Sequence, residues 1–523
     1  MKAYVQKASS QSSAVKLPPS DELRIAVSFK GRESGLGITK FAGRVSSASV
    51  GSFEPDPINV DRAIEELRKL GFVVTGRGEM TLSIRGSRAL FESTFSTKLS
   101  EFKLDPKVQA SAHSFLFPAA GAPWKPNPIL ENLIDDAYIQ WPHIYMATKK
   151  PVRTSTKRRA AHAGAVSIGK VATKKKRALG SVIPKVSYFH LNVIDDVPRL
   201  LNVDAIHTNG GSGAGVRIAM IDTGFAHSHP WFKKHSFASS IVLAPGASNR
   251  ETDPGSHGTG ESANIFAIAP KVTFIGVKLE DDNDPNGGAS ILEGFQEALK
   301  HSPQVISVSM GYDLRDGNSF TPLSALPNSL KALEAEIQAA VASGITVVFS
   351  AGNGHYSFPG MMPEVISAGG TFVDQNGAMK ASDYASAFPS AIYSGRSVPD
   401  FCGLVGMQPH ADYIMLPVPP GASIDKENAP HDLTKPNDGW AVFSGTSAAA
   451  PQLAGICALL IEKNPALRPA EVKAVLARTA RDVTTGHANP SSDANGVGVP
   501  AGPNRDGATG TGLVDAFAAW QQL

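Results

Sequence analysis

The sequence has few cysteines and no long apolar run. Its two cysteines, Cys402 and Cys457, are too few and too widely separated for a disulfide framework or a zinc cage. Cys457 lies in the apolar run AGICALLIEK, so we expect a buried structural thiol there. Residues 1–20 lack the apolar core of a secretory signal, and no run reaches the about 18 apolar residues that a membrane-spanning helix needs. We therefore expect a soluble chain with no membrane partner and no visible export signal.

Net charge is also small. The formal net charge of the 523-residue chain is +3, and only 19% of its residues are charged. No global field would therefore draw the whole molecule to nucleic acid or to an anionic membrane. We expect charge to matter only where it clusters.

One basic cluster interrupts this background between residues 148 and 178. No acidic residue lies there, and mostly small residues separate the basic ones, which are Lys149, Lys150, Arg153, Lys157, Arg158, Arg159, Lys170, Lys174, Lys175, Lys176 and Arg177. Such a block cannot bury enough apolar surface to overcome the entropy of ordering it, so we expect a mobile linker. A cleavable connector is the favoured role; the alternatives are a patch for nucleic acid or an acidic surface, and a plain spacer.

The linker divides the chain into three parts, predicted at 1–147, 148–185 and 186–523. In the first part, strand-like and helix-like stretches alternate over residues 21–105: LRIAVSF, VDRAIEELRKLGF, MTLSIRG and SRALFESTFSTKLSEF. This alternation predicts a small α+β unit with a ferredoxin-like core. It contains no cluster of nucleophile, base and electrophile, so we expect no chemistry there.

From about residue 190 onward, β-branched apolar runs alternate with helical patterns. The strand-like runs include VRIAMIDTG, VTFIGVKL, VISVSMG and ITVVFSAGNG, and the helical ones include ILEGFQEALKHSP and LKALEAEIQAAVASG. Continuous apolar strands between amphipathic helices predict an α/β fold, with a parallel sheet covered by helices on both faces. In such sheets chemistry gathers at the carboxyl ends of the strands.

Two polar residues stand at such junctions in the first half of this region. Asp222 ends the strand-like run VRIAMIDTG, where a carboxylate can face inward, although an Asp in a Gly-containing turn is common by itself. His257 lies in SHGTG at the entrance of a helical segment, and imidazole suits general-base work near neutral pH. A lone histidine in such a place would more often be structural.

Two further residues stand at equivalent places in the second half. Ser447 follows Gly445 and precedes an Ala-rich helix, so it could be a nucleophile beside free helix amides or merely a helix cap. Asn353 ends ITVVFSAGNG, and its side-chain amide could donate to an oxyanion together with the Ser447 backbone N–H, or simply occupy a turn. The combination is more informative than any one motif, because the four residues occur in this order at four such junctions.

From about residue 195 to the carboxyl terminus the chain resembles the subtilisin superfamily, through IDTG, SHGTG, VSMG, SAGNG and GTSAAAP. The resemblance implies a serine endopeptidase in which Asp222 orients His257, His257 deprotonates Ser447, and Ser447 attacks a peptide carbonyl to form an acyl-enzyme. It also implies two substrate-binding strands, made of Ser309, Met310 and Gly311 and of Ser350, Ala351 and Gly352. His355, Tyr356 and Ser357 are candidates for closing the pocket, and side-chain preference is left open.

The flanks of the catalytic region are similar to another branch of this superfamily, the sedolisins. RKLGFVVTGRGEMTLSIRGSRALFESTFSTKLSEF looks like their activation prodomain. ARDVTTG followed by AGPNRDGATGTG looks like their calcium loop, which implies a structural Ca²⁺ held by the carboxylates of Asp482 and Asp506 and the carbonyls of Val483, Gly502 and Asn504. Asp-rich Gly loops are otherwise often plain turns.

The chain departs from sedolisins at its catalytic positions, where they carry Glu in place of His257 and Asp in place of Asn353. Both differences favour subtilisin chemistry, so we expect activity to fall as pH drops below the pKa of the imidazole, ordinarily about 6.5. Glu261 lies where sedolisins have a second acidic residue, four residues after His257. It could be a relic or an auxiliary hydrogen-bond acceptor, but a solvated charge is the expected role.

These points predict a monomeric precursor that acts on proteins or peptides. Its amino-terminal unit would assist folding and block the cleft as an intramolecular inhibitor until the linker is cut, and the mature enzyme would begin between about residues 160 and 190. A calcium-bearing protease with a prodomain suggests an extracellular role, and the missing signal leaves a cytoplasmic one open. The rival functions are an inactive peptide-binding scaffold and a nucleic-acid-associated protein that uses the linker.

Overall fold

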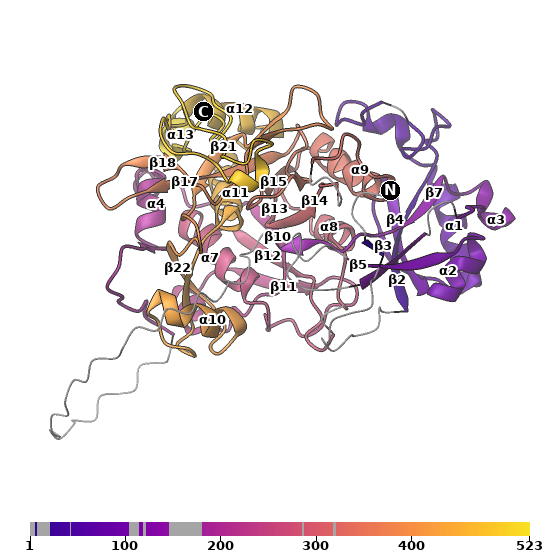
Figure 1. Cartoon of the computed structure of the whole chain (residues 1–523), viewed down its shortest axis with the longest axis horizontal. Coiled ribbons are helices and arrows are strands. Elements are labelled where there is room, and N and C mark those ends of the chain that lie inside the picture. Colours follow the sequence, from indigo (N-terminus) through magenta and orange to yellow (C-terminus); the bar gives the residue numbers. More distant parts are fainter. Residues whose placement is uncertain are drawn as a thin grey trace, which may run out of the picture.

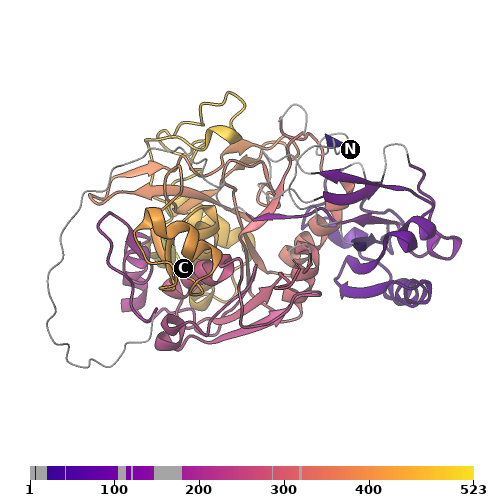
Figure 2. The same ribbon diagram turned by 60° about the horizontal axis from the view of Figure 1, so that its bottom comes forward.

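The computed structural model of the chain describes residues 6–7, 21–41, 43–103, 114–118, 122–145, 180–284, 287–316 and 321–523. The predicted linker at 148–185 lies outside the described residues up to residue 179. Figures 1 and 2 show an amino-terminal unit, indigo to purple, at one end of the molecule beside a larger body that contains the rest of the described chain.

A four-stranded antiparallel sheet, in the order β3-β4-β2-β7, forms the amino-terminal unit. Its elements are β2 (Glu22–Ser28), α1 (Pro57–Leu70), β3 (Val73–Arg77), β4 (Thr81–Ser87), α2 (Arg88–Thr94) and β7 (Asp136–Ile139). They follow one another in a β-α-β-β-α-β order. The fourth strand, β7, comes from beyond the stretch 21–105 in which the core was expected.

Local capping explains where α1 begins and ends. The Asp56 side chain accepts the amide of Ile58, and Gly71 closes the helix at φ 106°, a left-handed conformation that glycine adopts without strain. Val60, Ala63 and Leu67 recur at helical spacing and are buried in the core of the unit.

The helix expected over SRALFESTFSTKLSEF is wrong in its second half. α2 ends at Thr94, and Ser96 has φ 47°, which an α-helix does not allow. The chain then forms β5 (Leu99–Lys103), which lies between β1 (Gln6–Lys7) and β6 (Ser114–Pro118) in a small second sheet. Two short helices, η1 (Val50–Phe53) and α3 (Pro128–Glu131), complete the described elements of this unit.

The larger body contains an eight-stranded sheet in the order β11-β12-β10-β13-β15-β17-β18, with β21 also paired to β17. These strands are β10 (Arg217–Asp222), β11 (Ser239–Leu243), β12 (Thr273–Lys278), β13 (Val305–Val308), β15 (Thr346–Ser350), β17 (Ile366–Val373), β18 (Met379–Ala381) and β21 (Phe401–Leu404). All pairs in it are parallel except β17 with β18. The predicted α/β class with a parallel sheet is therefore confirmed.

Helices cover both faces of this sheet. One apolar core joins it to α7 (His257–Ile268) and α11 (Thr446–Lys463), and a second core joins its other face to α8 (Ile291–Leu299) and α9 (Asn328–Ala342). The amino-terminal sheet packs in turn on α8 and α9, so these two helices lie between the two sheets.

Short elements surround this framework. Three small sheets are made by β14 (Met310–Asp313) between β8 (Ile144–Tyr145) and β16 (Ser357–Phe358), by β22 (Ile414–Pro417) between β9 (Leu191–Asn192) and β23 (Trp440–Phe443), and by β19 (Phe388–Pro389) with β20 (Ser397–Val398). The remaining helices are α4 (Asp196–Leu200), α5 (Asp204–Thr208), α6 (Pro230–His235), α10 (Ser423–Asp432), α12 (Pro469–Thr479), η2 (Pro490–Ser492) and α13 (Ala516–Gln521).

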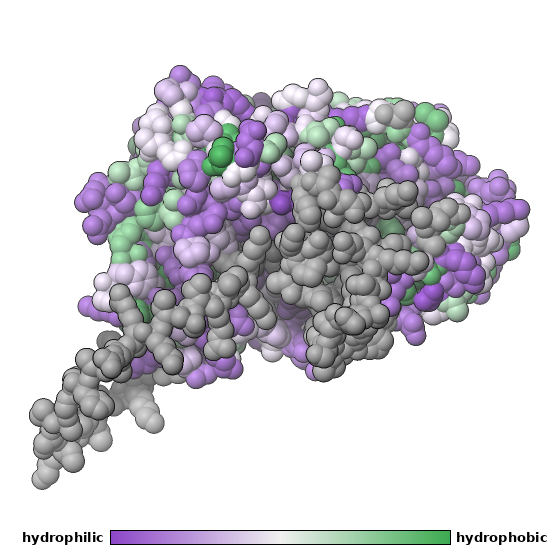
Figure 3. Space-filling view, in the orientation of Figure 1, coloured by the Kyte–Doolittle hydropathy of each residue, from purple (hydrophilic) through white to green (hydrophobic). Residues whose placement is uncertain are grey.

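The surface and the cysteines agree with the composition. On the face shown in Figure 3, hydrophilic residues are interspersed with only small hydrophobic areas among the coloured residues. None of the helices in the described part of the chain combines the length and apolarity needed to cross a bilayer. Cys457 is fully buried, as expected, and both cysteines are free thiols.

Candidate active site

The carboxyl end of β10 places Asp222 inside the protein. Its side chain is fully buried, and Oδ1 accepts hydrogen bonds from the Thr223 amide at 2.7 Å and from Nδ1 of His257 at 2.8 Å. Because a carboxylate only accepts, Nδ1 carries the hydrogen, and the neutral imidazole is left with its acceptor lone pair on Nε2. This is the tautomer that a general base needs.

Small and hydroxyl side chains hold α7 against the end of β10. A Cβ on Gly258 would overlap the carbonyl of Gly224, so only glycine allows this approach. Thr223 Oγ1 accepts the Gly258 amide at 3.0 Å and donates to Asp253 at 2.7 Å, and Asp253 also accepts the amide and hydroxyl of Thr259. The buried Asp253 carboxylate thereby connects Thr223, which follows Asp222, with Thr259, which lies two residues after His257.

Ser447 lies in the first turn of α11, next to β14. Its Oγ donates to the carbonyl of Ser309 at 3.4 Å, and the Ser309 hydroxyl donates to the carbonyl of Ser447 at 2.8 Å. Ser447 is 2% exposed, which keeps the hydroxyl in a largely water-free site. β14 is thus fixed directly beside the start of α11.

Asn353 meets the same helix turn from the end of β15. Its Oδ1 accepts the amide of Thr446 at 3.0 Å and the Thr446 hydroxyl at 2.9 Å, and that hydroxyl accepts the amide of Gly352 at 3.1 Å. A Cβ on Gly445 would lie 2.8 Å from Nδ2 of Asn353, so this glycine lets the amide nitrogen approach the turn that carries Ser447. The structure therefore brings Asn353 and Ser447 together.

Buried carboxylates set the charge around His257. Burial by itself lowers the pKa of His257, but the charge and hydrogen bond of Asp222, followed by the charges of Glu261 and Asp253, raise it to about 9. Burial raises the pKa of Asp253 to about 6, an effect that its hydrogen bonds with Thr259 and Thr223 oppose. The imidazolium is therefore favoured relative to an exposed histidine, whose pKa is about 6.5.

Glu261 is not the solvated charge that we expected. Its side chain is 1% exposed, because every residue of α7 is buried between the sheet and α11. Glu261 accepts a hydrogen bond from Nδ2 of Asn264 at 3.1 Å. Burial is also the main reason why its pKa rises to about 8.

The expected substrate-binding segments lie on two neighbouring elements. Ser309 precedes β14, which begins with Met310 and Gly311. Ser350 ends β15, and Ala351 and Gly352 follow it; all six residues are buried. β14 is already paired: Gly311 lies opposite Ile144 and Met310 opposite Tyr145 in an antiparallel register. The last described strand before the linker, β8, thus occupies the edge where a substrate backbone was expected.

The residues expected to bind calcium converge on one loop. Asp482 accepts the amide of Asn504 at 2.9 Å, and Asp506 accepts the amide of Gly502 at 3.1 Å, so both carboxylates meet the 502–504 segment. Val483, which follows Asp482 in the sequence, is buried. Within the described ranges, no group of three or more His, Cys, Asp or Glu side chains could hold a metal, so a cation here would depend on these two carboxylates and on backbone carbonyls.

Comparison with known proteins places the chain in a family. The sequence profile of the subtilase family matches residues 213–499, which include Asp222, His257, Asn353 and Ser447. The chain is 27% identical over 296 residues to subtilisin E of Bacillus subtilis (strain 168), covering 54% of this chain and 64% of that protein. It is 29% identical over 317 residues to serine protease AprX of the same organism, covering 54% and 66%.

Two further similarities extend over most of the compared protein. Subtilisin of Bacillus pumilus is 26% identical over 296 residues, which cover 89% of that protein. A crystal structure of a lanthipeptide protease is 21% identical, with a TM-score of 0.46, and the match covers 63% of this chain and 95% of that one. The chain belongs to the subtilase family. The region matched to subtilisin E spans less than two thirds of that protein's length. The resemblance to subtilisins is confirmed; the sedolisin-like prodomain and calcium loop stay predictions.

The structure adds three residues to the site that the sequence analysis did not select. Thr223 and Asp253 connect β10 to α7, and Thr446 fixes the orientation of the Asn353 amide. The two threonines stand inside the IDTG and GTSAAAP motifs, next to residues that were selected. Asp253 lies outside the SHGTG motif, and its contact with Thr223 at the end of β10 forms only in the folded chain.

Proposed function

We propose that this chain is a serine endopeptidase, made as a precursor whose amino-terminal unit inhibits its own active site. The observation that carries the proposal is the 2.8 Å hydrogen bond between Asp222 and His257 at the carboxyl end of the sheet, beside the α11 turn that carries Ser447. Family membership supports the same chemistry.

In this mechanism Ser447 Oγ attacks the carbonyl carbon of the substrate while His257 Nε2 takes the hydroxyl proton. Asp222 stabilises the imidazolium that forms. The Nδ2 of Asn353 and the Ser447 backbone N–H donate to the tetrahedral oxyanion. His257 then gives its proton to the leaving amine. In deacylation a water molecule attacks the acyl-enzyme while His257 takes its proton, and His257 returns that proton to Ser447.

Pairing of β8 with β14 supports inhibition by the amino-terminal unit. Hydrogen-bonding positions of Met310 and Gly311 that an extended substrate would use are taken by the backbone of residues 144–145. The same pairing prevents a second peptide from lying along this edge. Inhibition would end only when this segment leaves β14.

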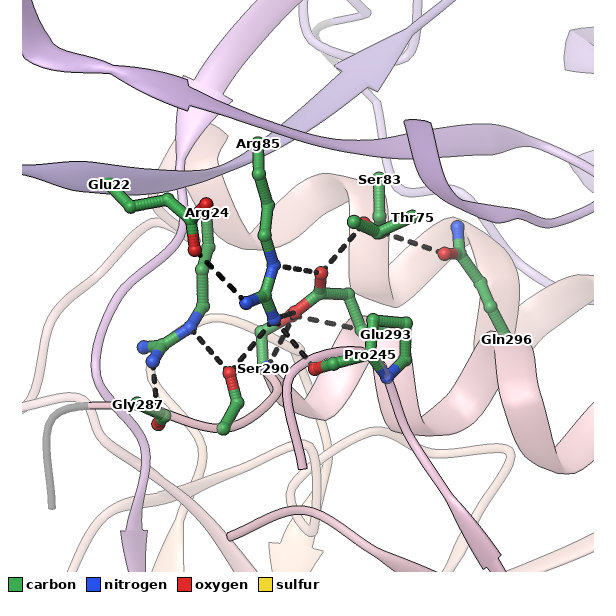
Figure 4. Close-up of polar contacts among 11 residues, drawn as sticks. Glu22, Arg24, Thr75, Ser83, Arg85, Pro245, Gly287, Ser290, Glu293 and Gln296 are labelled. Carbon is green, nitrogen blue, oxygen red and sulfur yellow. Dashed lines mark hydrogen bonds and ion pairs between the residues drawn. The ribbon is translucent and has the colours of Figure 1, made fainter. Parts of the chain in front are cut away.

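A buried polar interface holds the amino-terminal sheet on α8 (Figure 4). Arg85 of β4 donates to both carboxylate oxygens of Glu293 at 3.0 Å, and Thr75 donates to the same carboxylate at 2.7 Å. Arg85 also reaches the carbonyls of Pro245 and Gly288 at 2.7 and 2.8 Å. A paired arginine and glutamate that are both buried make one defined docking geometry.

The neighbouring helix α9 receives the β3–β4 turn. The fully buried carboxylate of Glu336 accepts the amides of Glu79, Met80 and Thr81 at 3.1, 3.0 and 2.7 Å, and the Thr81 hydroxyl at 2.7 Å. A Cβ on Gly78 would overlap this carboxylate. The turn therefore fits Glu336 only because residue 78 has no side chain.

The register of β8 also bears on where the precursor is cut. The chain runs from Ile144 opposite Gly311 to Tyr145 opposite Met310, and so it heads toward Ser309, whose carbonyl lies 3.4 Å from Ser447 Oγ. We infer that the first self-cleavage falls within the few residues after Tyr145. The start expected at about 160–190, which lies partly outside the described residues, would then result from later trimming.

Calcium is part of the proposal as a structural ion. The convergence of Asp482 and Asp506 on one loop suits a hard cation, which would supply positive charge between the two carboxylates. Such an ion takes no part in the chemical step. Together with the inhibitory unit it favours an extracellular place of action.

One experiment tests catalysis and precursor processing together. Purified full-length protein and its Ser447→Ala variant are incubated with calcium between pH 4 and 9, and the fragment sizes and new amino termini are followed with time. We expect cleavage just after Tyr145 at neutral to alkaline pH in the wild type and none in the variant. A wild-type chain that stays intact, and does not react with a fluorophosphonate probe after the linker is cut by another protease, would overturn the proposal.

A further inference from the structure

Glu261 is a buried acid on the helix that carries the proposed general base, and the mechanism above assigns it no role. It lies four residues after His257 on α7, so the two side chains share one helix face, with Cβ atoms about 5–6 Å apart. Both side chains are almost completely buried, at 1% and 4% exposure. A charge on Glu261 is therefore weakly screened by water when it acts on the imidazole.

A chain of side-chain amides fixes the position of Glu261. Asn264 donates to its Oε2 at 3.1 Å, and Gln452 of α11 donates to Oδ1 of Asn264 at 3.2 Å. Gln452 in turn accepts the amide of Leu404 in β21 at 2.7 Å. The carboxyl group is thus linked through hydrogen bonds to the nucleophile helix and to the sheet, and it is buried.

Of the charged groups around Glu261, His257 interacts most strongly with its charge. His257 lies one turn before it on α7, and Asp222 acts on it from β10. Asp253 acts on the same imidazole from the segment before α7. The contact from α11 passes through the neutral Gln452 and Asn264, and a Cβ at Gly260 would meet the apolar ring of Phe443. A negative charge on Glu261 is therefore balanced chiefly by a proton on His257.

We propose that Glu261 is a positioning residue that acts through His257: its buried carboxylate favours the protonated imidazole and so moves the acid limit of peptidase activity toward alkaline pH. The inference rests on the proposed function for its kinetic consequence only. The interaction itself exists whether or not the chain cleaves peptides.

The effect of the two groups on each other fits this role. The charge of Glu261 is one of the causes that raise the pKa of His257, and the charge of His257 opposes the rise in the pKa of Glu261 that burial causes. The active base is the neutral imidazole. Removing the charge of Glu261 must then lower the pH at which the base becomes available.

The test compares three variants in the processed enzyme. Glu261→Gln keeps the shape and an acceptor for Asn264 but removes the charge, Glu261→Leu removes both, and Glu261→Asp keeps the charge. We expect the acid limb of kcat/KM to move to lower pH by roughly one unit in Glu261→Gln and Glu261→Leu, because one buried charge at this distance has about that effect. Glu261→Asp should stay close to the wild type.

A second measurement does not depend on activity. In the full-length Ser447→Ala chain with ¹⁵N-labelled histidine, the titration midpoint of the His257 imidazole should fall by a similar amount when Glu261→Gln is added. An unchanged midpoint, or one that rises, would overturn the inference. A wild type that shows no peptidase activity, together with the expected shift of the imidazole, would overturn the proposed function and leave this inference standing.

Discussion

The two bodies of the molecule keep their own folds by large apolar cores, whereas they contact each other through buried polar groups together with a small apolar cluster that includes Phe53, Met80 and Ala335. The central sheet is enclosed by two apolar cores, and the amino-terminal unit has a third core around α1 and β4. Between them, the pairs Arg85–Glu293 and Thr81–Glu336 are direct polar contacts. Polar surfaces tolerate water after separation better than apolar ones do. In the proposed precursor, the polar part of this interface would give one defined docking geometry and could be rehydrated after cleavage.

The largest expected effect comes from removing the nucleophile, which lies in the larger body. Ser447→Ala should abolish self-cleavage and lower kcat on a peptide substrate by a factor on the order of 10⁴ to 10⁶, because the nucleophile is lost. Peptide hydrolysis and sodium dodecyl sulfate gels with time measure both. Substantial cleavage by the variant would show that Ser447 is not the nucleophile.

A smaller effect is expected from the oxyanion donor. Asn353→Ala should lower kcat by about 10² to 10³ with little change in KM, because its amide is needed most in the transition state. Steady-state kinetics of the processed enzyme measure this. A KM raised by a similar factor at unchanged kcat would mean that Asn353 serves substrate binding instead.

The Glu336 contact between the two bodies can be loosened by a substitution in the amino-terminal unit. Gly78→Ala places a methyl group against the Glu336 carboxylate, so several of its four hydrogen bonds should be lost and latent activity should appear roughly ten to a hundred times sooner after the first cut. Gly51→Ala is the matched control, because a Cβ there meets no atom within 4 Å. Equal timing in the two variants would show that this contact does not control release.

The pH dependence tests the charge arrangement in the larger body. Because neutral His257 is the active form and its pKa is raised to about 9, kcat/KM should rise about tenfold for each unit of pH below that value and then level off. The profile is measured on the processed enzyme, so the joint makes no contribution. An optimum near pH 4 would contradict the assignment of the base.

The smallest effect concerns stability and should be confined to the larger body. Saturating calcium should raise its unfolding temperature by several degrees, since a ligand at a hundred times its Kd adds about 2.7 kcal/mol to the free energy of unfolding. Asp506→Asn should remove most of this gain. Scanning calorimetry with and without a chelator measures both, and equal values in the wild type would argue against a calcium site.

The central sheet and the junction residues could be predicted because both depend on local patterns. Apolar runs such as that around Ile218 mark buried strands, and polar residues directly after them, such as Asp222, mark their carboxyl ends. Local patterns did not predict that Glu261 is buried, because its burial depends on α11 covering α7. It also missed the strand β5, because the amphipathic pattern around Phe95 continues past the left-handed residue Ser96.

Long-range contacts account for the rest of what could not be predicted. Nothing in the sequence connects Arg85 with Glu293, or residues 144–145 with β14, because each pair is brought together only when the two bodies dock. Asp253 escaped notice for a similar reason, since its contact with Thr223 spans thirty positions of the chain.

The pairing of β8 with β14 joins two stretches of one polypeptide, and this has a consequence for timing. In the proposed precursor, blockage of the cleft before the first cut is an intramolecular event that dilution cannot weaken. After the cut, the same strand is a separate ligand that leaves at its own rate and returns only as fast as its concentration allows. Under the proposed function, peptidase activity would therefore appear after a delay that the dissociation of the amino-terminal unit sets.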